Sequence, residues 1–110
     1  MSLRLPGRIE INRASAATGL QPIEQEIIGE MASSLGLAGR KAEEALAALR
    51  MADATVIAED REDRERRLRK TAAAVHAYFI QRELCGFRRH DDVIREMGIP
   101  RAVLVRLGAR

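Results

Sequence analysis

The sequence has 110 residues, a formal net charge of +3 and 46% hydrophobic residues, 18 of which are alanine. That length suits one domain with a single modest core. Aromatic residues make up only 3% of the chain and β-branched residues are sparse, which argues against a β-sandwich or barrel. Charged and apolar residues are evenly mixed, which argues against a disordered chain. The charge is uneven, since residues 1–58 carry a net charge of −1 and residues 59–110 a net charge of +4.

The first 20 residues differ in pattern from the rest of the chain. Pro6, Gly7 and Gly19 interrupt them, and their apolar residues follow no helical period. We therefore expect residues 1–20 to form a largely extended N-terminal arm. Helical periodicity begins after them, so residues 21–110 are expected to form a single helical domain.

A first helix is predicted over about 21–35. Thr18 and Gln21 have the spacing of a capping box, and Pro22 suits a first helical turn. Apolar residues at helical spacing predict one buried stripe along this helix, made of Ile23, Ile27, Ile28, Met31 and Leu35. Gly36 offers a left-handed stop, so we expect the helix to end there.

An antiparallel pair of helices is predicted over about 39–53 and 60–85. Neither Gly nor Pro occurs between Arg40 and Cys85, but one helix of that length would extend about 69 Å, too long for a compact domain of this size. A run of charged residues separates two apolar stripes, and acids precede bases in it, as suits the start of a helix. We therefore expect a turn within 53–60.

Two short C-terminal helices are predicted over about 91–97 and 100–107. Asp91 suits the cap of the first, Gly98 its end, and Pro100 the opening of the second. The expected fold class is therefore all-α, a small helical bundle of three main helices and two short ones.

The chain contains one candidate surface for binding a partner. Its residues are the aromatic Tyr78 and Phe87 and the apolar Met97. The alternative is that Phe87 simply fastens the C-terminal segment to the bundle. Alanine-rich faces on the two later main helices allow close approach but bury little area each. We therefore expect a second copy of the chain to complete the packing, giving a homodimer.

The basic C-terminal half favours a second function, DNA-associated regulation. Gly98 fits the turn of a helix-turn-helix made by the two short helices. The candidate nucleic-acid contacts are Arg88, Arg89, Arg101 and Arg106. Against this function, the second short helix is barely two turns long and its outer face offers Ala102 and Val105 instead of polar side chains. Nucleic acid is therefore the less favoured partner.

No residue pattern indicates catalysis, a metal or a cofactor. Two histidines and the single cysteine, Cys85, lack the spacing of a zinc site, and phosphate-binding loops and nucleophile motifs are missing. One cysteine cannot form an intramolecular disulfide, and no apolar run reaches the length of about 18 residues that a membrane span needs. We expect a cytoplasmic protein that is not an enzyme, with a small-molecule-binding helical bundle as the third possibility.

One segment, from Gln81 to Leu107, carries a family resemblance. It begins with Gln81-Arg82-Glu83-Leu84-Cys85-Gly86 and leads into Ile99-Pro100-Arg101. It is similar to a family of small bacterial all-helical proteins, a domain of unknown function. The resemblance implies a helical fold and a bacterial cytoplasmic protein, and it assigns no site. The sequence as a whole favours a non-catalytic helical association module, oligomeric or adaptor-like.

Overall fold

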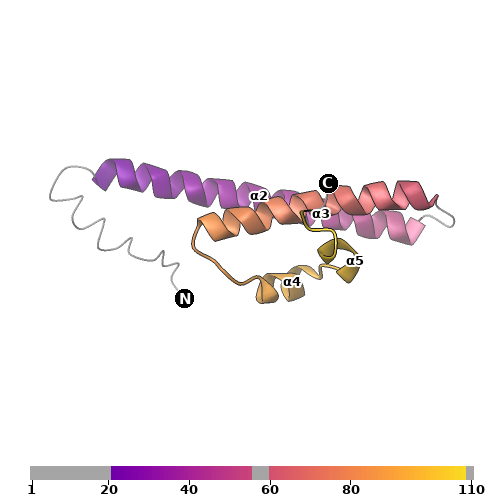
Figure 1. The fold of residues 1–110 in the computed structure, drawn as a ribbon. Coiled ribbons are helices and arrows are strands. Elements are labelled where there is room, and N and C mark those ends of the chain that lie inside the picture. Colours follow the sequence, from indigo (N-terminus) through magenta and orange to yellow (C-terminus); the bar gives the residue numbers. More distant parts are fainter. Residues whose placement is uncertain (1–20, 56–59, 109–110) are drawn as a thin grey trace.

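The protein is a long helical hairpin with two short helices folded back along it (Figure 1). The computed structural model describes residues 21–55 and 60–108, and helices are the only regular elements in that part of the chain. They are α2 (Gln21–Thr55), α3 (Arg61–Leu84), α4 (Asp91–Met97) and α5 (Arg101–Leu104). The prediction of an all-α fold is confirmed, whereas the expected extended arm at 1–20 lies outside the described residues.

The predicted break after residue 35 is wrong, because 21–35 and 39–53 are two parts of the one helix α2. Neither Gly36 nor Gly39 has a positive φ, so neither ends a helix. At Gly39 an added Cβ would lie 3.2 Å from Cε1 of the Tyr78 ring. This glycine therefore lets α3 approach α2 closely, which is a packing role that sequence cannot distinguish from a stop.

The turn expected within 53–60 falls mainly on residues 56–59, which lie outside the described residues, between the end of α2 at Thr55 and the start of α3 at Arg61. α2 ends at Thr55, whose hydroxyl donates a hydrogen bond to the carbonyl of Met51 at 2.8 Å. Asp60 is extended and precedes α3. Across this end of the hairpin, Arg64 of α3 pairs with Asp53 of α2. The predicted helices over 39–53 and 60–85 therefore do lie antiparallel, as the second part of α2 and as α3.

α3 ends in a Schellman motif. The amide of Phe87 donates to the carbonyl of Arg82 at 3.0 Å, and the amide of Gly86 donates to the carbonyl of Glu83 at 3.0 Å. Gly86 has a φ of 100°, which a residue with a Cβ adopts only with strain. This reversal brings the following segment back along the hairpin (Figure 1).

The predicted bounds are correct for the first of the two C-terminal helices and too wide for the second. α4 has the predicted bounds and ends before Gly98, which has a φ of 62°. α5 covers only part of the predicted 100–107, because residues after Leu104 continue as tighter turns. The amide of Arg106 donates to the carbonyl of Val103 at 3.0 Å, a bond spanning three residues instead of four.

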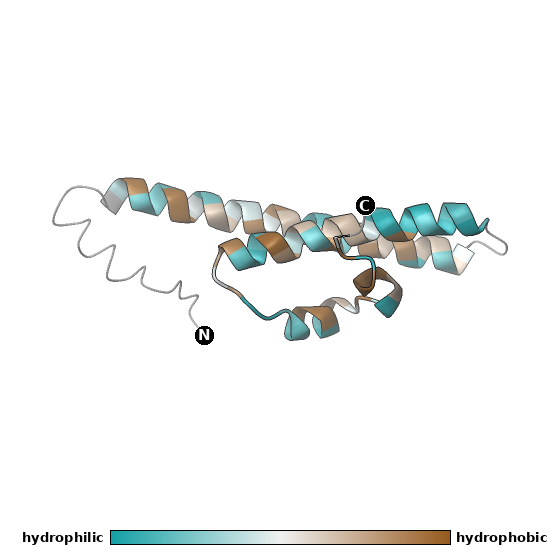
Figure 2. Cartoon of the chain, in the orientation of Figure 1, coloured by the Kyte–Doolittle hydropathy of each residue, from teal (hydrophilic) through white to brown (hydrophobic). Residues whose placement is uncertain are grey.

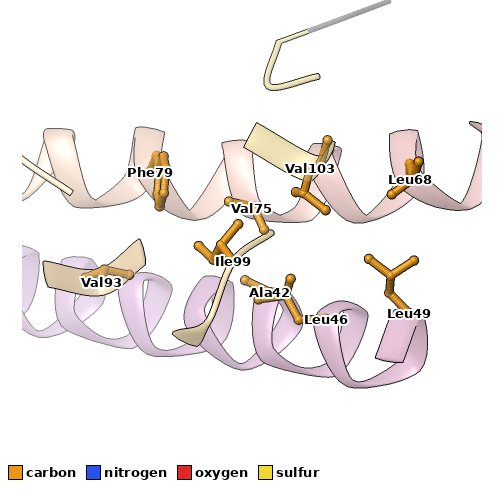
Figure 3. Packing of buried hydrophobic residues seen from close by; sticks show 10 residues of the cluster. Ala42, Leu46, Leu49, Leu68, Val75, Phe79, Val93, Ile99 and Val103 are labelled. Carbon is orange, nitrogen blue, oxygen red and sulfur yellow. The ribbon is translucent and has the colours of Figure 1, made fainter. Parts of the chain in front are cut away.

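The core lies in the middle of the hairpin, where α2, α3 and the C-terminal segment meet (Figure 3). Leu46 of α2, Val75 of α3 and Val103 of α5 are its largest fully buried side chains. The buried apolar residues of this cluster are Ala42, Leu46, Leu49, Leu68, Ala72, Val75, Phe79, Val93, Ile99 and Val103. None of them belongs to the first half of α2, so that half of the helix contributes nothing to the buried core.

Candidate interaction surface

The N-terminal end of α2 projects beyond the end of α3 (Figure 1). Three contacts fix the antiparallel register: Arg64 with Asp53, the Tyr78 ring over Gly39, and the thiol of Cys85, 3.9 Å from the carbonyl oxygen of Met31. α3 therefore ends beside Met31. Residues 21–30, which we call the α2 overhang, have no part of α3 beside them.

The α2 overhang contains large apolar residues, and parts of its ribbon are coloured as hydrophobic in Figure 2. Ile23 and Ile27 are 56% and 51% exposed, and Ile28 and Met31 are half-buried. The buried stripe predicted from the sequence lies here, and the prediction is wrong for Ile23 and Ile27, which are exposed. Ile28, Met31 and Leu35 continue at helical spacing into the core residues of α2, whereas Ile23 and Ile27 lie to the side of that row.

The α2 overhang is also acidic. Glu24, Glu26 and Glu30 lie in it, whereas the sequence has no Lys, Arg or His between Arg13 and Arg40. Glu26 and Glu30 are exposed. This end of the molecule therefore combines exposed apolar side chains with the two exposed carboxylates of Glu26 and Glu30.

The three residues predicted to form a partner surface do not form one patch. Tyr78 and Phe87 lie near each other on either side of Arg82, whose guanidinium carbon is 5.9 Å and 4.9 Å from the two ring centroids. Met97 lies at the end of α4, where its carbonyl accepts a hydrogen bond from Nη1 of Arg50 at 3.5 Å. Tyr78 and Met97 are half-buried against the core, so much of their apolar surface is already used within the chain.

Arg82 organises the turn between α3 and α4, a role that sequence analysis missed. Arg82 is 8% exposed, its Nε donates to Nδ1 of His90 at 3.0 Å, and its Nη2 donates to the carbonyl of Arg89 at 3.0 Å. Because Nδ1 of His90 accepts, the ring proton is on Nε2, which donates to Glu83 at 3.0 Å. The His90 ring stacks on Phe79 at a centroid distance of 4.2 Å. These polar groups are satisfied by one another and hold the fold together.

The four arginines predicted to contact nucleic acid lie at different places in the fold and differ in whether they pair with an acid. Arg106 donates from Nε and Nη2 to the two carboxylate oxygens of Glu65, at 2.9 and 2.7 Å. This bidentate hydrogen bonding is the main reason that the pKa of Glu65 falls to about 2; desolvation opposes it and Arg69 adds to it. Arg89 pairs with Asp91 at 3.4 Å. Arg88 and Arg101 are exposed, and neither has an ion-pair partner among the described residues.

Other kinds of site have little support in the part of the chain that the structure describes. α5 is a single turn of helix, too short to present a row of side chains to a DNA groove. Within residues 21–55 and 60–108, no three His, Cys, Asp or Glu residues are grouped so that they could hold a metal ion. Among these residues, no helix is both long and apolar enough to span a bilayer.

The comparisons with known proteins give one match. The profile of a family of unknown function, DUF6665, matches residues 1–110. No curated protein and no solved structure matches the chain.

Proposed function

We propose that the chain, which belongs to the DUF6665 family, is a non-catalytic association module that forms a homodimer through the apolar face of α2. The observation that carries this proposal is the exposure of Ile23 and Ile27 at the α2 overhang, 56% and 51%. The proposal includes a bacterial cytoplasmic setting, where the single thiol of Cys85 stays reduced.

The energetics of the exposed isoleucines support association. Burying a fully exposed isoleucine stabilises a protein by about 1.5–3 kcal/mol. Since Ile23 and Ile27 keep about half of their surface in contact with water, each retains about half of that amount, roughly 0.8–1.5 kcal/mol, for a partner. In a symmetric dimer each contribution counts twice, so these two residues alone provide a useful driving force.

The elongated shape supports the same proposal. The radius of gyration is 18.0 Å and the principal extents are 64 × 24 × 21 Å. A compact chain of about 110 residues has a radius of gyration of about 13 Å. An elongated helix pair has much surface for its volume, and a second copy laid along it reduces the apolar part of that surface.

Mass measurement at several concentrations tests the proposal. We expect light scattering to give twice the chain mass of 12.2 kDa at high concentration and a fall towards 12.2 kDa on dilution. The variant Ile27→Ser should shift this transition to higher concentration, whereas Met51→Ser, which removes a more exposed apolar side chain from the other end of α2, should not. A mass of 12.2 kDa at every concentration up to millimolar would refute the proposed self-association.

A further inference from the structure

We infer that the groove between the second half of α2 and the first half of α3 binds an anionic amphiphile, a carboxylate carried by one unbranched apolar chain. We call this surface the α2–α3 groove. It lies away from the exposed Ile23 and Ile27 of the α2 overhang, so the inference goes beyond the proposed self-association. It gives a place in the fold to the third possibility that the sequence suggested, a helical bundle that binds a small molecule.

The α2–α3 groove lies on a side of the hairpin that the C-terminal segment leaves open. Its described lining residues all belong to α2 and α3. The C-terminal segment meets α3 at Glu65, the partner of Arg106, whereas the groove contains Lys70, which lies about 140° further around the helix. The volume of the groove is about 590 Å³, within the range of about 300–1,000 Å³ that is usual for ligand sites.

The floor of the α2–α3 groove is apolar because α2 presents two alanines there. Ala45 is half-buried and Ala48 is exposed, and their spacing of three residues places both on one side of the helix. Leu49 completes the α2 side of the groove and is 2% exposed. Thr71 of α3 is also buried, and its hydroxyl donates to the carbonyl of Arg67 at 3.0 Å. An apolar chain lying on this floor therefore meets no unpaired hydrogen-bond donor.

The wall that α3 contributes is basic. Arg66, Arg67 and Lys70 line it together with one acid, Asp63, which pairs with Arg66. Lys70 is exposed and pairs with no acid among residues 21–55 and 60–108. Figure 2 shows this half of α3 as mostly hydrophilic. The positive charge of the groove is therefore confined to its α3 wall, opposite the alanines of α2.

This arrangement selects the chemistry of the ligand. An apolar chain on the α2 side gains free energy in proportion to the surface that it buries, and an anionic head group gains from the unpaired ammonium of Lys70. A cationic head group on the same chain would meet like charge. The groove runs from Asp63 to Thr71, about 12 Å along α3. A partner helix of usual length, 11–12 residues or about 17 Å, is longer than the groove, so a small molecule fits it better.

Equilibrium dialysis of the full-length protein against decanoate tests the inference. Three other ligands separate the contributions of the chain and of the head group. Decyltrimethylammonium has the same chain with a positive head group, acetate has the carboxylate without the chain, and octanoate has a shorter chain. We expect each of them to bind at least several-fold more weakly than decanoate, because each lacks part of the apolar or the ionic contact.

Two matched pairs of variants locate the site. Ala48→Leu puts a larger side chain into the groove and should weaken the binding of decanoate at least several-fold, whereas Ala47→Leu makes the same change at an exposed alanine outside the groove and should not. Lys70→Gln removes the unpaired charge and should also weaken binding several-fold, whereas Lys41→Gln, at an exposed lysine outside the groove, should not. Circular dichroism checks the fold of all four variants. Lys70→Gln alters only an exposed side chain, so it tests the site even if Ala48→Leu disturbs the packing of the helices.

The outcomes separate this inference from the proposed function. No binding of decanoate at millimolar concentration would refute the inference. Binding that Ala48→Leu and Lys70→Gln leave unchanged, or that decyltrimethylammonium matches, would also refute it. A loss of binding in Ile27→Ser would assign the ligand to the α2 overhang instead. Light scattering of the same samples reports self-association separately, so a monomeric protein that binds decanoate in the groove would contradict the proposed dimer and leave the inference standing.

Discussion

Replacing Gly36 by alanine should stabilise the protein. Gly36 lies in the interior of α2 without a positive φ, and a Cβ added there would meet only Nη1 of Arg40, at 3.4 Å, the far end of a flexible side chain. Glycine in a helix interior is less favourable than alanine by about 0.5–1 kcal/mol, because it loses more backbone entropy on folding. The free energy of unfolding should rise by that amount, and the thermal midpoint by about 2–8 °C.

Urea denaturation followed by circular dichroism measures the sign of this change. If α2 instead ended at residue 35 with Gly36 in the left-handed conformation, alanine there would cost about 1–2 kcal/mol. The two structures therefore predict opposite signs. A Gly36→Ala protein that unfolds at a lower urea concentration than the wild type would refute a continuous helix from Gln21 to Thr55.

Gly39 and Gly86 provide matched controls for this measurement. Gly39→Ala has the same gain in helix propensity, but its Cβ would lie 3.2 and 3.4 Å from two atoms of the Tyr78 ring. Its stabilisation should therefore be smaller than that of Gly36→Ala, or reversed. Gly86→Ala should destabilise the protein by about 1–2 kcal/mol, because Gly86 has a φ of 100°.

Two further predictions concern the core and the ion pair between Glu65 of α3 and Arg106, which follows α5. Leu46 is 1% exposed, so Leu46→Ala should lower the free energy of unfolding by about 2–5 kcal/mol. Met51 is 66% exposed, so Met51→Ala should change the free energy of unfolding by less than about 0.5 kcal/mol. Similar losses for the two variants would contradict the assigned core. Arg106 lowers the pKa of Glu65 from 4.5 to about 2, so this pair stabilises the fold above pH 4.5 and loses that contribution as the pH falls towards 2. Glu65→Gln should therefore be less stable than the wild type at pH 7, and it should lose less stability than the wild type between pH 4.5 and pH 2. Urea titrations at these pH values measure both differences. An equal loss of stability in the two proteins between pH 4.5 and pH 2 would contradict the linkage.

Local signals in the sequence were sufficient for most of the helices but not for the continuity of α2. The bounds of α4 follow from Asp91 and Gly98, and the charged run over 59–67 indicates the start of α3. Gly36 and Gly39 carry the same signal as a helix stop, but their cost in a helix interior is only about 1 kcal/mol each. Packing of Tyr78 over Gly39 outweighs that cost, and this contact depends on a residue of another helix.

The candidate surface shows the same division between local and long-range information. Helical spacing identified the apolar row from Ile23 to Leu35, because spacing is a property of one segment. Its exposure depends on where α3 ends relative to α2, which the register of the hairpin decides. Arg82 was missed because nothing in the neighbouring sequence distinguishes a buried arginine from an exposed one; its partners His90 and Arg89 become neighbours only after Gly86 reverses the chain.

The burial of Val103 has a consequence for synthesis of the protein on the ribosome. This residue is 0% exposed and packs between α2 and α3, although it is translated long after either of them. Until it has left the exit tunnel, the nascent hairpin keeps an open apolar seam beside Leu46 and Val75. The native core therefore closes only after the chain has emerged as far as Val103, and until then the nascent hairpin exposes apolar surface to chaperones.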